Sequence, residues 1–185
     1  RYVALRKGVL AVDEIHMYDL YAPLIDELEL KVSYAEAAKQ LAEALTPLGE
    51  EYINDMKRGL ASRWVDVYEN EGKTSGAYSW GTYGTEPYIL MNYQDKVNDL
   101  FTLAHEIGHS MHSYYSNANQ PQVYANYRIF VAEVASTLNE ALLMHYLLEN
   151  TTDKRVRLYY LNHYLEQFRA TLYRQTMFAE FELLI

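Results

Sequence analysis

Apolar residues recur at helical spacing in six stretches of the chain. One of them opens at Ser33 with a glutamate three positions later, which is the pattern of a capping box, and predicts a helix that ends near Leu45. Thr46 and Pro47 then predict the N-cap and first turn of a second helix that reaches Gly59. The other helices are expected at about residues 1–12, 95–115, 128–149 and 153–183.

The pattern changes between Arg63 and Tyr93, where Gly, Ser, Thr, Tyr and Trp dominate. Three short runs of β-forming residues, separated by glycine-bearing turns, predict a small antiparallel β-sheet. These runs cover residues 64–68, 77–80 and 88–91. A further extended segment is expected over residues 15–21, before Pro23. The expected fold class is therefore mainly α with a small antiparallel sheet.

Composition narrows the functional classes. Sixteen Lys and Arg against 25 Asp and Glu leave a net charge of −9, which disfavours nucleic acid and anionic lipid as partners. The chain has no cysteine, so thiol catalysis and thiolate metal sites are excluded, and no oxidising compartment is required. No apolar run reaches the roughly 18 residues of a membrane span. We therefore expect a cytoplasmic protein with neither a nucleic-acid nor a membrane partner.

The sequence His-Glu-Ile-Gly-His occupies residues 105–109. Residues four apart on a helix differ in direction by only about 40°, so His105 and His109 leave the same face and can hold one metal ion. Chance alone gives roughly 0.02 such matches in a chain of this composition. The opposite face of this helix carries the apolar residues Leu100, Leu103, Ala104, Ile107 and Met111.

A zinc ion held by two histidines needs one more carboxylate or imidazole, and a catalytic site leaves the fourth position open to water. Glu133 and Glu140 lie about 20° apart on the next predicted helix, and an antiparallel return would place Glu133 opposite the histidines. We predict Glu133 as the third ligand and Glu140 as a residue that supports a ligand. The alternative for both glutamates is a solvated helix face.

We predict a supporting or substrate-facing role for His112 and for residues 76–78. His112 lies on the metal-binding face, but as a fourth protein ligand it would close the site to water. The segment of Gly76, Ala77 and Tyr78 is expected to border a sheet edge to which an extended peptide can add as a strand. The alternative for this segment is an ordinary β-turn flank. The remaining histidines, at positions 16, 145 and 163, are assigned ordinary structural positions.

Several segments together resemble the oligoendopeptidase F branch of the thimet oligopeptidase family of zinc peptidases. They are residues 75–79, 87–93, 102–112, 130–140 and 174–182. The resemblance implies that His105, His109 and Glu133 bind one zinc ion and that Glu106 is the catalytic base. It also implies a helical, two-lobed fold around a channel that admits short peptides. The expected function is hydrolysis of short oligopeptides by zinc-activated water with a glutamate general base.

Members of that family continue into a tyrosine-rich segment that contacts substrate, and this chain has no match to it. Residues 1–185 are therefore interpreted as one catalytic-region fragment, truncated at both ends. Two alternatives stay open at this point: a helical module that binds metal without catalysis, and a helical interaction domain with an accidental histidine motif. The sequence carries no signal for an oligomeric state.

Overall fold

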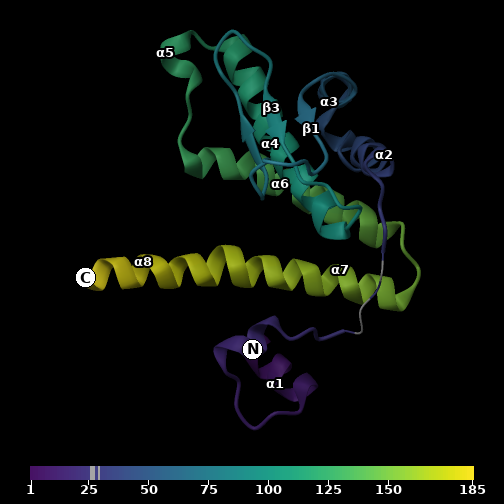
Figure 1. Ribbon diagram of the computed structural model, residues 1–185, viewed down its shortest axis with the longest axis vertical. Helices are drawn as coiled ribbons and strands as arrows, with labels where there is room; N and C mark the ends of the chain where they lie inside the picture. The colour runs from purple at the N-terminus through teal and green to yellow at the C-terminus, as the bar shows by residue number, and fades with distance from the viewer. Residues whose placement is uncertain (26–27, 29) are drawn as a thin grey trace. The chain divides into compact units, whose positions relative to one another are not determined.

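The computed structural model describes residues 1–25, 28 and 30–185, and the chain divides into two compact units (Figure 1). One unit comprises Leu30–Asn150 and is called the site unit below. The other comprises Arg1–Glu29 and Thr151–Ile185 and is called the terminal unit. Among the described residues, no helix combines the length and apolar character that a membrane crossing requires.

The site unit contains five α-helices, one 3-10 turn and three short strands among its described residues. In chain order they are α2 (Tyr34–Ala44), η2 (Thr46–Leu48), α3 (Glu50–Ala61), β1 (Val65–Asp66), β2 (Tyr78–Trp80), β3 (Tyr88–Leu90), α4 (Val97–Asn119), α5 (Gln122–Ala125) and α6 (Ile129–Glu149). The terminal unit contains α1 (Tyr2–Leu10), η1 (Met17–Tyr21), α7 (Lys154–Gln167), η3 (Phe168–Tyr173) and α8 (Arg174–Leu184). The mainly helical fold class is confirmed.

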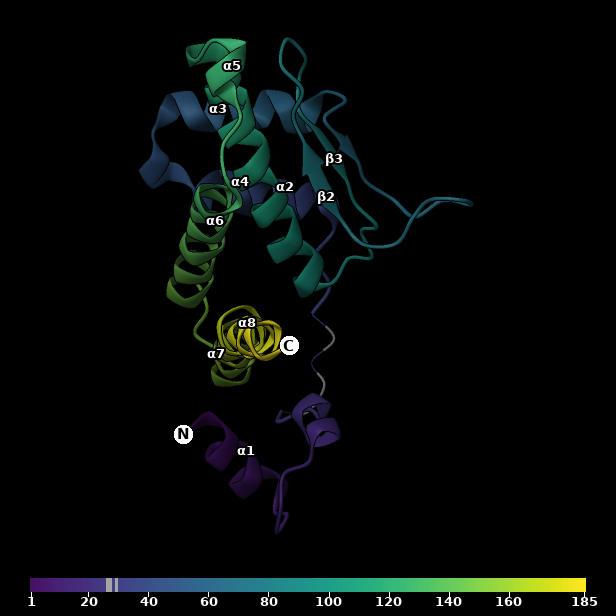
Figure 2. The ribbon, with the colours of Figure 1, turned by 90° about the vertical axis from the view of Figure 1, so that its left-hand side faces the viewer.

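Helix α4 lies between α6 on one side and the sheet on the other (Figure 2). Its predicted apolar face is buried: Leu100, Leu103 and Ile107 are at most 1% exposed. Gly108 permits the close approach of α6, because a Cβ at this position would lie 2.6 Å from the Ser136 Cα atom and 2.7 Å from the Ala135 carbonyl oxygen. The absence of a side chain at Gly108 therefore sets the spacing of the two helices.

The sheet has three strands in the order β1-β3-β2. Strands β2 and β3 are antiparallel, with Ser79 opposite Ile89, as expected. The expectation of a purely antiparallel sheet is wrong for the other pair, because β1 and β3 run parallel, with Val65 opposite Ile89. The long connection over residues 67–77 carries the chain past the position where β3 later inserts. Strand β2 is consequently left at an edge of the sheet.

Two helix starts test the capping predictions. The Ser33 side chain accepts a hydrogen bond from the Glu36 amide at the start of α2, so the Ser33 half of the predicted capping box is confirmed. The helix predicted from Pro47 is wrong at its start, because residues 46–48 form only a 3-10 turn. Gly49 then adopts φ 95°, a conformation that interrupts a helix, and α3 begins at Glu50.

The segment before Pro23 also differs from its prediction. Residues Met17–Tyr21 form a 3-10 turn instead of an extended strand. The Asp19 carboxylate accepts a hydrogen bond from the His16 amide and closes this turn. A local side-chain bond therefore determines a conformation that the apolar pattern alone does not predict.

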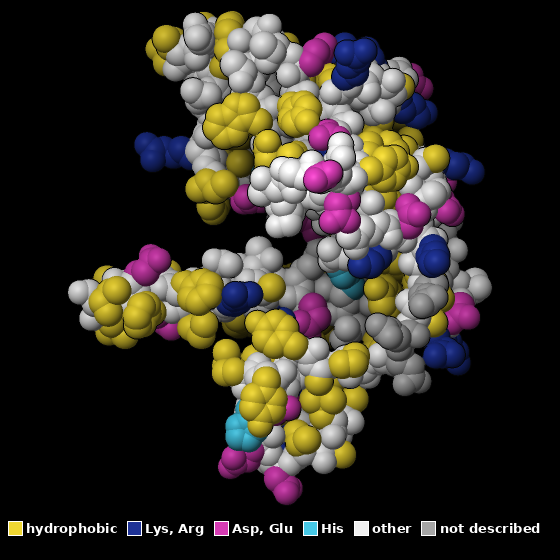
Figure 3. Space-filling view, in the orientation of Figure 1, with side chains coloured by type: hydrophobic (Ala, Val, Ile, Leu, Met, Phe, Trp, Pro, Cys, Tyr) yellow, Lys and Arg dark blue, Asp and Glu magenta, His cyan; other side chains and the backbone are white. Residues whose placement is uncertain are grey.

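The terminal unit is organised around Arg6, which is 2% exposed. Its guanidinium donates hydrogen bonds to the Asp19 and Ala22 carbonyls and forms an ion pair with Glu166 on α7. The single helix predicted for residues 153–183 is interrupted by the π-helical turn of η3. Hydrophobic side chains, including the exposed Phe181 and Leu184, gather around α8 (Figure 3).

Candidate metal centre

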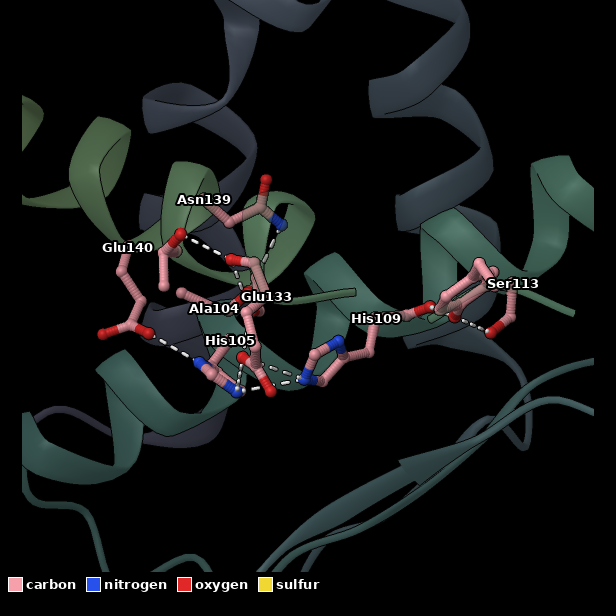
Figure 4. Close-up of polar contacts among 10 residues, drawn as sticks. Ala104, His105, His109, Ser113, Glu133, Asn139 and Glu140 are labelled. Carbon is pink, nitrogen blue, oxygen red and sulfur yellow. Dashed lines mark hydrogen bonds and ion pairs between the residues drawn. The ribbon is translucent and has the colours of Figure 1, made fainter. Parts of the chain in front are cut away.

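Two imidazoles project from α4 one helical turn apart. The Nε2 atoms of His105 and His109 lie 3.0 Å from each other (Figure 4). Both residues belong to the face of α4 opposite its buried apolar stripe, as their spacing predicts. The helix thus holds two nitrogen lone pairs toward one point without help from a loop.

Helix α6 supplies a carboxylate at the same point. The Glu133 Oε2 atom lies 3.4 Å from His105 Nε2 and 3.7 Å from His109 Nε2. The buried Ser136 hydroxyl, one turn further along α6, donates a hydrogen bond of 2.8 Å to this Oε2 atom. The predicted antiparallel return of α6 therefore does bring Glu133 opposite the two histidines (Figure 4).

The three donor atoms fit one divalent cation. They all lie within 4.8 Å of one another. A tetrahedral zinc ion with bonds of about 2.0–2.2 Å separates its ligand atoms by roughly 3.3 Å, and the three observed separations bracket that value. Two imidazoles and one carboxylate are also the donor types that zinc accepts, with a fourth position left for water.

His105 is held from behind by an acceptor. Its Nδ1 atom lies 2.6 Å from the Glu140 Oε1 atom. An Nδ1 atom that carries the proton leaves the Nε2 lone pair of His105 free for a metal. Glu140 thus lies where the sequence prediction requires a ligand-supporting residue (Figure 4).

The pKa values of the two histidines move in opposite directions. Burial lowers the pKa of His105, but the hydrogen bond and charge of Glu140 outweigh this effect, with smaller contributions from Glu106 and Glu133, and the net change is upward. Burial and the nearby His105 lower the pKa of His109, and the charge of Glu133 does not compensate. The hydrogen bond to Glu140 therefore distinguishes the surroundings of His105 from those of His109.

Glu106 is buried beside the two histidines, with 7% of its surface exposed. Burial raises its pKa, although the charge of His105 and a backbone hydrogen bond from Ser79 act in the opposite direction. The Ser79 and Ser110 hydroxyls lie 2.7 Å apart and join β2 to α4 just beyond Glu106. Edge strand β2 and the buried carboxylate are therefore parts of one local arrangement.

The segment before β2 borders this arrangement. Gly76 has φ 94°, and its carbonyl accepts a hydrogen bond of 2.9 Å from the Asn92 side chain. Tyr78 begins the edge strand and is 48% exposed. A substrate-facing role for residues 76–78 stays a prediction.

His112 lies outside the three-residue cluster. Its ring stacks on Tyr127 with a centroid distance of 3.7 Å, and its buried Nδ1 atom has no hydrogen-bond partner among the described residues. Burial lowers its pKa. Its supporting or substrate-facing role therefore stays a prediction as well.

Sequence reasoning missed Asn139, which is 1% exposed in the middle of α6. Its Nδ2 atom donates to the Ala104 carbonyl at 3.2 Å and to the Tyr52 hydroxyl at 3.0 Å. The residue thus ties α6 and α3 to the turn of α4 that precedes His105 (Figure 4). An asparagine at helical spacing from the apolar Ala132 and Leu143 was the available signal.

Comparison of the sequence with known proteins identifies close relatives. The chain is 63% identical over all 185 residues to oligopeptidase PepF of Bacillus subtilis, of which it covers 28%. It is 49% identical over 182 residues to the chromosomal oligoendopeptidase F of Lactococcus lactis subsp. cremoris, covering 98% of this chain and 30% of that protein. The chain thus spans less than a third of these relatives.

Solved structures agree with the sequence matches. A proposed peptidase from Chlamydophila abortus is 45% identical, with a TM-score of 0.85 over 98% of this chain and 30% of that one. Oligoendopeptidase-F from Enterococcus faecium is 38% identical, with a TM-score of 0.62 over 99% of this chain and 24% of that one. The model of peptidase family M3 matches residues 1–185. The chain therefore belongs to peptidase family M3.

Proposed function

We propose that this chain is the catalytic region of a longer zinc endopeptidase that hydrolyses peptide bonds in short oligopeptides. The observation that carries the proposal is the convergence of His105, His109 and Glu133 beside the buried Glu106. The names of the relatives from Bacillus subtilis and Lactococcus lactis, an oligopeptidase and an oligoendopeptidase, support the choice of substrate.

The two histidines and Glu133 would hold the ion through Nε2, Nε2 and Oε2, with Glu140 and Ser136 fixing two of these ligands. Zinc in such a site polarises the scissile carbonyl and makes a water molecule acidic near neutral pH. The fixed orientation of the ligands means that little rearrangement is needed when the ion binds.

Glu106 is the proposed general base. It takes a proton from the attacking water and then delivers that proton to the leaving amine. Burial suits this carboxylate to the task, since its raised pKa makes it a better proton acceptor.

The edge of β2 that does not pair with β3 is the proposed platform for the peptide backbone. An extended substrate would pair with the strand near residues 76–79 and be held by main-chain hydrogen bonds, so that recognition does not depend on one side chain. A complex with a substrate analogue should show these bonds. A bound analogue that makes no backbone contact with residues 76–79 would remove this part of the proposal.

Elemental analysis after dialysis tests the metal site. We expect about one zinc ion per chain, lost in His105→Ala. His145→Ala is the matched control, because His145 is exposed on α6 and pairs only with Glu149 in the described contacts. Equal zinc content in the His105 variant and wild type would refute the ligand assignment.

Peptide hydrolysis by the full-length, zinc-loaded protein tests the base. Glu106→Gln should retain zinc and lower kcat by about 10³-fold, because the amide cannot accept the proton. Glu149→Gln, an exposed glutamate on α6, should leave kcat unchanged. Turnover at the wild-type rate in the Glu106 variant would show that another group is the base.

A further inference from the structure

A cavity of about 390 Å³ opens directly beside the metal centre. His109 lines it, so the wall of the cavity and the ligand set share a residue. Trp80 and Gly81, at the end of β2, form a second side, and residues 125–127 with Ile129 form a third. The cavity thus lies where the edge strand, α4 and the start of α6 meet.

The position of the cavity follows the path of an extended substrate. Ser79 and Trp80 of β2 line this cavity together with His109, so a peptide that pairs with the edge of β2 would place its scissile carbonyl beside this ligand. Successive side chains of an extended peptide point to opposite sides. One of the two residues that flank the scissile bond would therefore direct its side chain past His109 and into this cavity.

The lining is rigid on the side of α4. The Tyr127 ring stacks on His112, and its hydroxyl lies 2.6 Å from the Ser113 Oγ atom. The Asn117 side chain donates to the Thr82 carbonyl at 3.4 Å, which ties α4 to the turn after β2. The shape of the cavity is therefore largely set before a ligand enters.

The lining is also uncharged. Among the described residues that line it, none is Asp, Glu, Lys or Arg. Indole, phenol and aliphatic groups from Trp80, Tyr127 and Ile129 alternate with the amides of Asn117 and Asn126. An ionised side chain would lose water here without gaining an opposite charge, whereas aromatic, aliphatic or amide side chains lose little.

From this geometry we infer that the cavity is a specificity subsite that accepts an uncharged side chain next to the scissile bond. The inference rests on the proposed peptidase function and adds the chemistry of the preferred substrate. Asn126 is the residue at which the charge of the cavity lining can be changed, because it is exposed, follows α5 and lines the cavity. A charge introduced there should change which substrates are preferred.

The test measures kcat/KM of the full-length, zinc-loaded protein on peptides of one length with Phe, Gln, Glu or Lys at each residue flanking the scissile bond. At one flanking position, Phe and Gln should be cleaved at least about tenfold faster than Glu and Lys. Asn126→Lys should raise the relative rate for Glu, and Asn126→Asp that for Lys, by about three- to fivefold. Asn98→Lys and Asn98→Asp, at an exposed site in the first turn of α4, should change neither ratio.

The outcomes separate the two proposals. The subsite would be overturned if kcat/KM did not depend on charge at either flanking position, or if the Asn126 variants left the preferences unchanged. The proposed peptidase function would stand in both cases. Failure of the zinc-loaded wild type to cleave any peptide would overturn the function, and the subsite with it. A reciprocal change in charge preference is not expected from structural damage, since both Asn126 variants would then lose activity on all peptides alike.

Discussion

The long helix of the site unit and that of the terminal unit are held in place by different means. Helix α4 has eleven buried residues, most of them apolar. In the terminal unit, α7 has one buried residue, Tyr160, and α8 has none. The terminal unit instead buries the charged Arg6 against Glu166. A helix with one face fixed by apolar packing can present polar ligands on the other, and α4 has that division whereas α7 and α8 do not.

Of the substitutions proposed below, Gly108→Ala should cause the largest loss of stability, and this loss should fall on the site unit. The added methyl group would lie 2.6–2.9 Å from backbone atoms of α6, which cannot rotate away as a side chain can. The helices must separate, which we expect to destabilise the site unit by about 3 kcal/mol. Zinc affinity should also fall, because Glu133 moves away from the histidines.

Hydrogen exchange and zinc titration of the Gly108 variant would measure both effects. Faster exchange confined to α4 and α6, together with weaker zinc binding, is the expected result. Unchanged zinc affinity would show that the spacing of the two helices does not determine the site.

Replacing Arg6 by Met tests how much the buried charge stabilises the terminal unit. The variant removes the hydrogen bonds to the Asp19 and Ala22 carbonyls and leaves Glu166 with only Arg169 as its described cation partner. We expect a loss of about 2 kcal/mol, because these carbonyls lose their donors while the apolar side chain still fills the space. The effect should be confined to the terminal unit.

Segment-resolved hydrogen exchange can verify this confinement. Residues 1–25 and 154–184 should exchange faster in the Arg6 variant, whereas α4 and zinc content should match wild type. Lys7→Met, one residue further on the exposed side of α1, is the matched control. Loss of zinc in the Arg6 variant would show that the two units are energetically coupled.

The contrast between the periodic apolar face of α4 and the long-range contact of Arg6 explains which features the sequence could predict. The apolar period located α4 and α6 within a few residues, and the four-residue spacing placed His105 and His109 on one face. Glu133 followed from an antiparallel return of α6. These features depend on local periodicity and on one short connection, which are both visible in a sequence.

Other features depend on partners far apart in the chain. The parallel pairing of β1 with β3 requires knowing which strand inserts between the other two. The role of Arg6 requires Glu166, 160 positions away, and an arginine directly before the exposed Lys7 gives no sign of it. The clearance at Gly108 likewise depends on backbone atoms of α6. Such contacts become apparent only once the elements are packed.

Replacing Glu140 by Gln should have a smaller effect, which is confined to the affinity of the site for zinc. The amide keeps the size of the side chain but removes the charge that raises the pKa of His105. Zinc affinity should fall by about tenfold, since the imidazole becomes a weaker donor. Competition with a chelator would measure the change, and the exposed Glu149→Gln is the control. An affinity equal to wild type would mean that Glu140 orients nothing that the metal needs.

Replacing Gly8 by Ala should have the smallest effect, and one of opposite sign to that at Gly108. Gly8 is exposed in α1, and a Cβ at this position would meet no atom within 4 Å. Alanine therefore adds helix propensity without a clash and should stabilise α1 by about 0.5–1 kcal/mol. Slower hydrogen exchange in residues 2–10 would record this gain. Faster exchange would show that this face of α1 is covered, and that its glycine, like Gly108, is present because another element approaches closely.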